Sequence, residues 1–114
     1  MSDCLFCKII KGDIPCEKVF ENEKVLGFRD IAPMSKDHYL FINKIHTSDV
    51  NEIIKQCPEQ LAEVFKGIED FTSSNELSQN GFRVVTNVGK HAGQTVFHTH
   101  FHVLGGEKLG KFGS

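Results

Sequence analysis

Residues 95–104 read TVFHTHFHVL, and this stretch decides how the rest of the chain is interpreted. Aromatic and β-branched residues are frequent in it, as is typical of a β-strand. Successive side chains of a strand point to opposite faces, so every second residue shares a face. One face of this strand therefore carries three histidines, namely His98, His100 and His102. The other face, which we expect to be the packed one, carries Thr99, Phe101 and Val103.

The spacing along a strand limits what three such histidines can do together. At a rise of ~3.3 Å per residue, neighbouring histidines lie about 6.6 Å apart and the outer two about 13 Å apart. A zinc–nitrogen bond is only ~2.0–2.1 Å long, so the three rings of a regular strand cannot share one metal ion. We expect separate tasks, in which one imidazole reacts and the others orient it or supply a proton. An imidazole can also accept a phosphoryl or nucleotidyl group covalently.

A glycine-rich segment at residues 88–94 leads directly into this strand. Glycine lets backbone amides approach a phosphate closely. A single histidine on a strand is usually structural, but three at alternate positions beside such a segment favour a functional site.

The remaining sequence predicts an α+β domain with an antiparallel sheet and helices on one side. Strands are expected over residues 25–30 (VLGFRD), 38–43 (HYLFIN) and 82–87 (FRVVTN). Apolar residues recur at helical spacing over residues 58–76, and a shorter helix is expected near 48–55. No linker or repeat divides the chain, so residues 1–114 are predicted to form a single domain.

Composition excludes several classes of function. Thirteen basic residues against fifteen acidic ones give a net charge of −2, so no broad cationic face for nucleic acid is expected. No apolar run approaches the ~18 residues that a membrane span needs, and the first eleven residues are too polar for a signal peptide. We therefore expect a cytoplasmic protein with reduced thiols.

Two of the four cysteines have the spacing of a metal half-site. Cys4 and Cys7 form a Cys-x-x-Cys pair, which needs two more ligands to close a tetrahedral zinc site. His46 and one end of the histidine row are candidates for these ligands. The alternative is that both cysteines are small buried residues. Cys16 and Cys57 have no partner at ligand spacing and are interpreted as inert thiols.

The segment GQTVFHTHFHVLGG at residues 93–106 resembles the signature of the histidine-triad (HIT) superfamily, and its ending resembles the branch of histidine-triad nucleotide-binding proteins. The similarity covers residues 4–106, with further matches in LFCKII (5–10), GDIP (12–15), FRDIAP (28–33) and KIH (44–46). The resemblance implies a five-stranded antiparallel sheet with one long and one short helix. It also implies a homodimer whose two sheets join into one of ten strands.

The resemblance further implies a site for a purine nucleotide and cleavage at its α-phosphate. His100 would be the nucleophile, flanked by His102 and by His98, which helps to orient it. Asp30 would bind the ribose hydroxyls. The residues expected to line the base pocket are Leu5, Phe6, Ile9, Phe28 and Ile31. Those expected around the phosphate are Asn87, Gly93, Gln94 and Thr95, with the Thr95 hydroxyl near the leaving group.

For the metal, the resemblance implies a structural zinc ion bound by Cys4, Cys7, His46 and His98. This agrees with the spacing argument, which allows one histidine of the row, but not all three, to reach a metal. In a metal-free alternative, His46 only hydrogen-bonds His98.

The function implied is hydrolysis of purine nucleoside phosphoramidates of the AMP-amine type, through a nucleotidyl-histidine intermediate. A dinucleoside polyphosphate hydrolase is the alternative enzyme, which Gly105 and Gly106 disfavour. A non-enzymatic, zinc-stabilised nucleotide-binding module is the alternative outside enzymes. Thr95 replaces the serine of many members but keeps a hydroxyl. The tail at residues 107–114 lacks the Trp-Pro-Pro-Gly ending of animal members, so the resemblance does not fix the leaving group.

Overall fold

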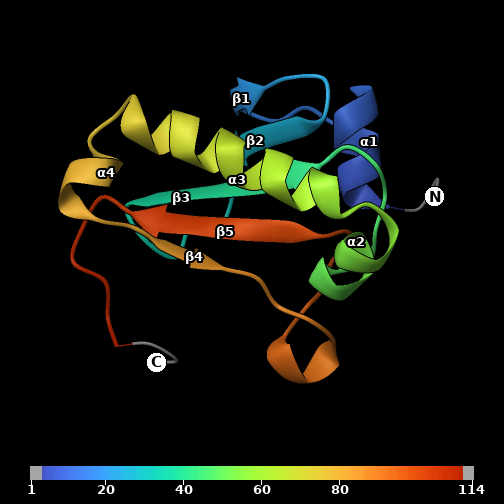
Figure 1. Ribbon diagram of the computed structural model, residues 1–114. Helices are drawn as coiled ribbons and strands as arrows, with labels where there is room; N and C mark the ends of the chain where they lie inside the picture. The colour runs from blue at the N-terminus through green and yellow to red at the C-terminus, as the bar shows by residue number, and fades with distance from the viewer. Residues whose placement is uncertain (1–3, 112–114) are drawn as a thin grey trace.

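A five-stranded antiparallel sheet forms the centre of the molecule in the computed structural model, which describes residues 4–111 (Figure 1). Along the sheet the strands follow the order β1-β2-β3-β5-β4. Their bounds are Lys18–Glu21 for β1, Val25–Arg29 for β2, Asp37–Asn43 for β3, Arg83–Val85 for β4 and His100–Gly105 for β5. The α+β fold with an antiparallel sheet is thereby confirmed.

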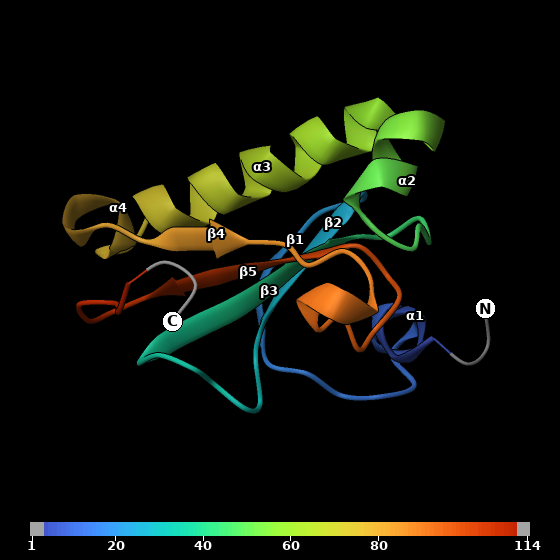
Figure 2. The same ribbon diagram turned by 90° about the horizontal axis from the view of Figure 1, so that it is seen from below.

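The helices lie on both faces of this sheet rather than on one side as predicted. Helix α3 (Pro58–Ser73) crosses one face, and α1 (Leu5–Lys11) packs against the opposite face (Figure 2). The predicted long and short helices are confirmed as α3 and α2 (Val50–Gln56), whereas α1 and strand β1 were not predicted. The remaining elements are α4 (Leu77–Asn80) and a 3₁₀ turn, η1 (Lys90–Ala92).

The strand expected over residues 95–104 begins only at His100. Its partner β3 pairs Ile42 with His100 and ends at Asn43, so the residues before His100 have no strand to pair with. Instead, the backbone N–H of Thr99 donates to the Thr47 carbonyl over 2.8 Å. Residues 95–99 therefore enter the sheet as an irregular segment, and His98 lies outside the regular strand.

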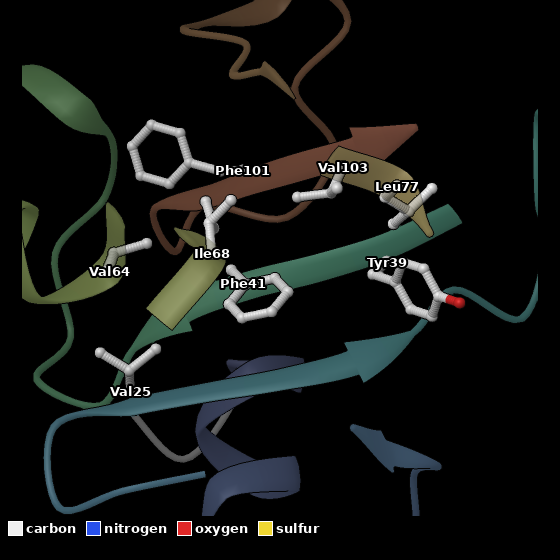
Figure 3. Packing of buried hydrophobic residues seen from close by; sticks show 8 residues of the cluster. All are labelled: Val25, Tyr39, Phe41, Val64, Ile68, Leu77, Phe101 and Val103. Carbon is white, nitrogen blue, oxygen red and sulfur yellow. The ribbon is translucent and has the colours of Figure 1, made fainter. Parts of the chain in front are cut away.

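The core consists of two clusters, one on each face of the sheet. Tyr39 and Phe41 of β3 point toward α3 together with Phe101 and Val103 of β5, which confirms the predicted packed face for these two residues of β5 (Figure 3). Thr99, the third residue predicted on that face, lies before the strand. On the other face, Leu40 and Ile42 join residues of α1 and β2. His100 and His102 pair with Ile42 and Leu40, so both histidines lie on this second face. Within residues 4–111, no helix has the length and apolar character required to span a membrane.

Candidate active site

Two cavities meet at His100, His102 and Thr95, on the sheet face opposite α3. The first has a volume of about 280 Å³ and lies between α1 and β2. It is lined by all six residues predicted to contact the base and ribose, namely Leu5, Phe6, Ile9, Phe28, Asp30 and Ile31. The structure thus brings these residues together. Ile31 is 99% exposed, which places it at the rim of the cavity.

The second cavity, of about 470 Å³, lies on the side of β4 and the C-terminal tail. Asn87, Gly93 and Thr95, three of the residues predicted around the phosphate, line it. Gln94 lines neither cavity. Its side chain accepts from the Gly89 N–H over 2.8 Å and donates to the Ser48 carbonyl over 2.7 Å. Gln94 therefore holds the loop in shape, and its side chain is occupied inside the protein.

His100 has one ring nitrogen available for reaction. Its Nδ1 lies 2.7 Å from the His98 carbonyl, which can only accept, so Nδ1 carries the proton. The other nitrogen, Nε2, then keeps its lone pair in the neutral ring. Burial lowers the pKa of His100 below its usual value, and this keeps the ring neutral at pH 7. Phe6 packs against the ring with centroids 5.1 Å apart. This is the protonation state that a nucleophilic imidazole needs.

His102 belongs to a second group of side chains, with His38 and Asp30. The backbone N–H of Met34 donates to His38 Nδ1 over 3.0 Å, so the proton of neutral His38 sits on Nε2. This Nε2–H lies 2.9 Å from His102 Nδ1 and 3.4 Å from Asp30 Oδ2. Burial, with the neighbouring His100 and His38, lowers the pKa of His102 to about 4. Neutral His102 thus accepts at Nδ1 and carries its own proton on Nε2.

His38 is a functional candidate that the sequence did not reveal. Its side chain is 1% exposed, and burial lowers its pKa although Asp30 opposes the shift. The residue reaches His102 because β3 pairs with β5 in a register that sets Leu40 opposite His102. The segment HYLFIN indicated a strand, but only the pairing register places His38 beside the histidine row.

The four predicted metal ligands form one cluster. Their ligand atoms all lie within 4.8 Å of one another. His98 Nδ1 is 3.4 Å from Cys4 Sγ, and His46 Nδ1 is 3.3 Å from Cys7 Sγ. His98 Nε2–H donates to the Asn43 carbonyl over 2.7 Å, which leaves the Nδ1 lone pair directed at the sulfur atoms. Such an outer hydrogen bond is what a metal-binding histidine requires.

The donor set of this cluster also suits a metal ion. Two thiols and two imidazoles are a common tetrahedral zinc set. Burial and the neighbouring Cys4 raise the pKa of Cys7 to about 11, so the free thiol keeps its proton until a metal displaces it. The metal-free alternative required a hydrogen bond between His46 and His98. Instead, the two rings meet edge to face with centroids 5.0 Å apart, and both Nδ1 atoms face sulfur.

The ligand atoms of Asp30, His38 and His102 are also close enough to surround an ion. The Met34 N–H argues against this use. A metal on His38 Nε2 would move the ring proton to Nδ1, where it would face the Met34 N–H, another donor. This group is therefore suited to holding a proton, and the cysteine cluster to holding a metal.

The sequence and structure match those of known proteins. A model of the HIT domain matches residues 11–109. An uncharacterized HIT-like protein of Helicobacter pylori is 44% identical over 104 residues, covering 91% of this chain and 97% of that protein. The purine nucleoside phosphoramidase of Escherichia coli K12 is 32% identical over 108 residues, covering 95% and 91%.

Among solved structures, a HIT family hydrolase from Clostridium thermocellum superimposes with a TM-score of 0.92 at 38% identity, covering 97% of this chain and 96% of that one. The match of the family model spans most of the chain, and the fold and the histidine row agree with it. The chain belongs to the HIT family.

Proposed function

We propose that this protein is a hydrolase of purine nucleoside phosphoramidates that works through a nucleotide bound covalently to His100. The observation that carries the proposal is the hydrogen bond from His100 Nδ1–H to the His98 carbonyl. It leaves an unprotonated Nε2 on the residue at which the two cavities meet. The Escherichia coli relative, named a purine nucleoside phosphoramidase, supports this choice of substrate.

In the proposed reaction the nucleoside occupies the first cavity, with its base among the apolar side chains and its ribose hydroxyls on Asp30. His100 Nε2 attacks the α-phosphorus, and the phosphorus–nitrogen bond breaks. The positive charge that develops on the ring is stabilised by the Nδ1–H bond to the His98 carbonyl.

The departing nitrogen needs a proton, and we assign its relay to the hydroxyl of Thr95; this choice is supported by the position of Thr95 in the lining of both cavities. Water then attacks phosphorus and releases AMP and free His100. The proton that this water gives up restores the one passed to the amine. His102 keeps the orientation set by its bond to His38 Nε2–H throughout.

We also propose that the cluster of Cys4, Cys7, His46 and His98 binds a structural zinc ion. Four protein ligands fill a tetrahedral shell, so no position is left for a reacting water. Zinc there would tie α1, which forms a wall of the first cavity, to the segment that precedes His100. The predicted homodimer remains a proposal as well: β4 ends the sheet and offers an edge to a second copy.

The test is turnover of an AMP-amine substrate by the purified protein and by His100→Ala. We expect the variant to lose turnover entirely while its affinity for AMP, measured by calorimetry, changes less than about threefold. His91→Ala serves as a matched control, because His91 is exposed on η1 and lines neither cavity. Near-normal turnover in His100→Ala would exclude the covalent mechanism. Binding without turnover in the wild-type protein would favour the non-enzymatic module.

A further inference from the structure

The second cavity contains two cationic side chains that the mechanism above does not use. Arg83 of β4 and Lys111 of the tail both line it, together with the shared residues Thr95, His100 and His102. No aspartate or glutamate is present among the described residues that line this cavity. Its charge is therefore positive on the side that faces away from α1.

The cations of the two cavities differ in their partners. Arg29 lines the first cavity, but its Nε donates to Glu17 Oε2 over 3.1 Å, and Asp30 adds a second carboxylate nearby. Arg83 instead donates from Nη2 to the Gly110 carbonyl over 2.8 Å, a bond that positions the guanidinium without cancelling its charge. Over residues 4–111, neither Arg83 nor Lys111 has a carboxylate oxygen within 4.0 Å.

The position of the reacting phosphorus assigns each cavity to one part of a substrate. Phosphorus must reach His100 Nε2, where the cavities meet. If the nucleoside occupies the apolar cavity, the group that leaves extends into the second one. We infer that Arg83 and Lys111 select leaving groups that carry an anionic group, and that the preferred leaving group is an amine with a carboxylate, as in an amino acid. This inference rests on the proposed function.

A carboxylate suits these two side chains. The planar guanidinium of Arg83 presents paired N–H donors that match a carboxylate, and Lys111 adds a second positive charge. Both side chains are reached by water, so the expected effect is moderate, within the range of exposed ion pairs. It should also weaken as salt concentration rises.

The experiment compares two substrates that differ only in charge: AMP joined through nitrogen to alanine, and AMP joined in the same way to alaninamide. For the wild-type protein we expect kcat/KM to favour the alanine compound by about fivefold. Arg83→Gln and Lys111→Gln should each lower this ratio about twofold, and the double variant should bring it close to one. Because the ratio is taken on one protein sample, a general loss of activity or folding does not change it.

Lys108→Gln is the matched control. It removes the same charge from the same tail at an exposed residue that does not line the cavity, and it should leave the ratio unchanged. A ratio near one in the wild-type protein, with both compounds turned over, would overturn the inference and leave the proposed function intact. If the wild-type protein turns over neither compound, both the inference and the proposed function are overturned.

A third substrate separates the two sources of anionic charge. Diadenosine triphosphate places phosphate rather than carboxylate in the second cavity. Suppose that Arg83→Gln and Lys111→Gln slow hydrolysis of diadenosine triphosphate, while the wild-type protein turns over the alanine and alaninamide compounds with equal kcat/KM. The cations then recognise phosphate, and the assignment to amino acids is wrong. If the ratio of kcat/KM for the alanine compound to that for the alaninamide compound falls in the two variants as predicted, and diadenosine triphosphate is a poor substrate, the assignment to a carboxylate is supported.

Discussion

Two clusters of side chains, one containing His98 and the other His38, turn opposite sides of the imidazole inward. Both rings carry their proton on Nε2, but His98 faces its cluster with Nδ1 and His38 faces its cluster with Nε2–H. Around Cys4 and Cys7, the Asn43 carbonyl accepts a hydrogen bond from His98 Nε2–H, which leaves the Nδ1 lone pair inside the cluster. Around Asp30, the Met34 N–H donates to His38 Nδ1 and leaves a proton inside the cluster. A backbone group next to each imidazole thus decides whether the cluster is suited to a metal or to a proton.

Loss of metal from the cysteine cluster should have the largest effect on the molecule. Cys7→Ser removes a ligand, and we expect metal content to fall from one ion per chain to a small fraction of that. Because binding of a structural metal contributes directly to folding, the free energy of unfolding should fall by about 3 kcal/mol or more. Elemental analysis and urea unfolding measure these two quantities.

Cys16→Ser is the control for this prediction, since Cys16 is also a thiol near α1 but lies outside the cluster. It should retain full metal content. Equal metal content in Cys7→Ser and the wild-type protein would show that the cysteine cluster does not bind a metal ion.

Separate alanine substitutions of His38, in β3, and of His46, in the segment that follows β3, should distinguish the functions of the two clusters. We expect His38→Ala to keep its metal but to lower kcat/KM about 10- to 100-fold, because His102 loses the N–H that orients it. His46→Ala should lose metal instead. The two variants are compared by elemental analysis and by turnover of an AMP-amine. Metal loss in His38→Ala would mean that the hydrogen-bond directions were assigned wrongly.

The depressed pKa of His102 should appear in the pH dependence of stability. In the unfolded chain a histidine titrates near pH 6.5, whereas folded His102 has a pKa of about 4. Between these values the unfolded state binds more protons, so stability is fully present above pH 6.5 and falls as the pH drops toward 4. We expect the wild-type protein to lose on the order of 1–2 kcal/mol more than His102→Gln between pH 7 and pH 5. Urea midpoints of both proteins at the two pH values test this; equal losses would contradict it.

Thr95 belongs to neither cluster, and changes there should have the smallest effect. Thr95→Ser keeps the hydroxyl where the cavities meet and should alter kcat by less than about twofold. Thr95→Val keeps the shape but removes the hydroxyl, so it should lower kcat more than KM rises. If Thr95→Val matches the wild-type rate, the proton reaches the leaving group by another route.

The sequence predicted those features that depend on local pattern. The sequence pattern located α3 and four of the five strands, β2 to β5. The distance argument correctly separated His98 from His102, which lie in different clusters. Features that depend on tertiary partners were missed. Helix α1 has only seven residues, and its first turn is capped by the Cys4 sulfur, which accepts from the Cys7 N–H over 3.4 Å. Its apolar residues become informative only once Phe6 and Ile9 pack against the sheet.

The start of β5 and the position of His38 beside His102 were missed for a related reason. Both depend on where β3 ends and on the register in which it pairs with β5, and neither is encoded in a local pattern. The side chain of Gln94 shows the same limit, because its partners, the Ser48 carbonyl and the Gly89 N–H, lie on different segments of the chain.

The central claim is that His100 Nε2 bonds to phosphorus. It is tested most directly by mixing the protein briefly with an AMP-amine substrate, quenching the reaction, and measuring intact mass, followed by peptide mapping of the adduct. We predict a mass increase of one adenylyl group, located on His100, and its absence in His100→Ala. Turnover without any adduct, or an adduct on His98 or His102, would contradict the mechanism.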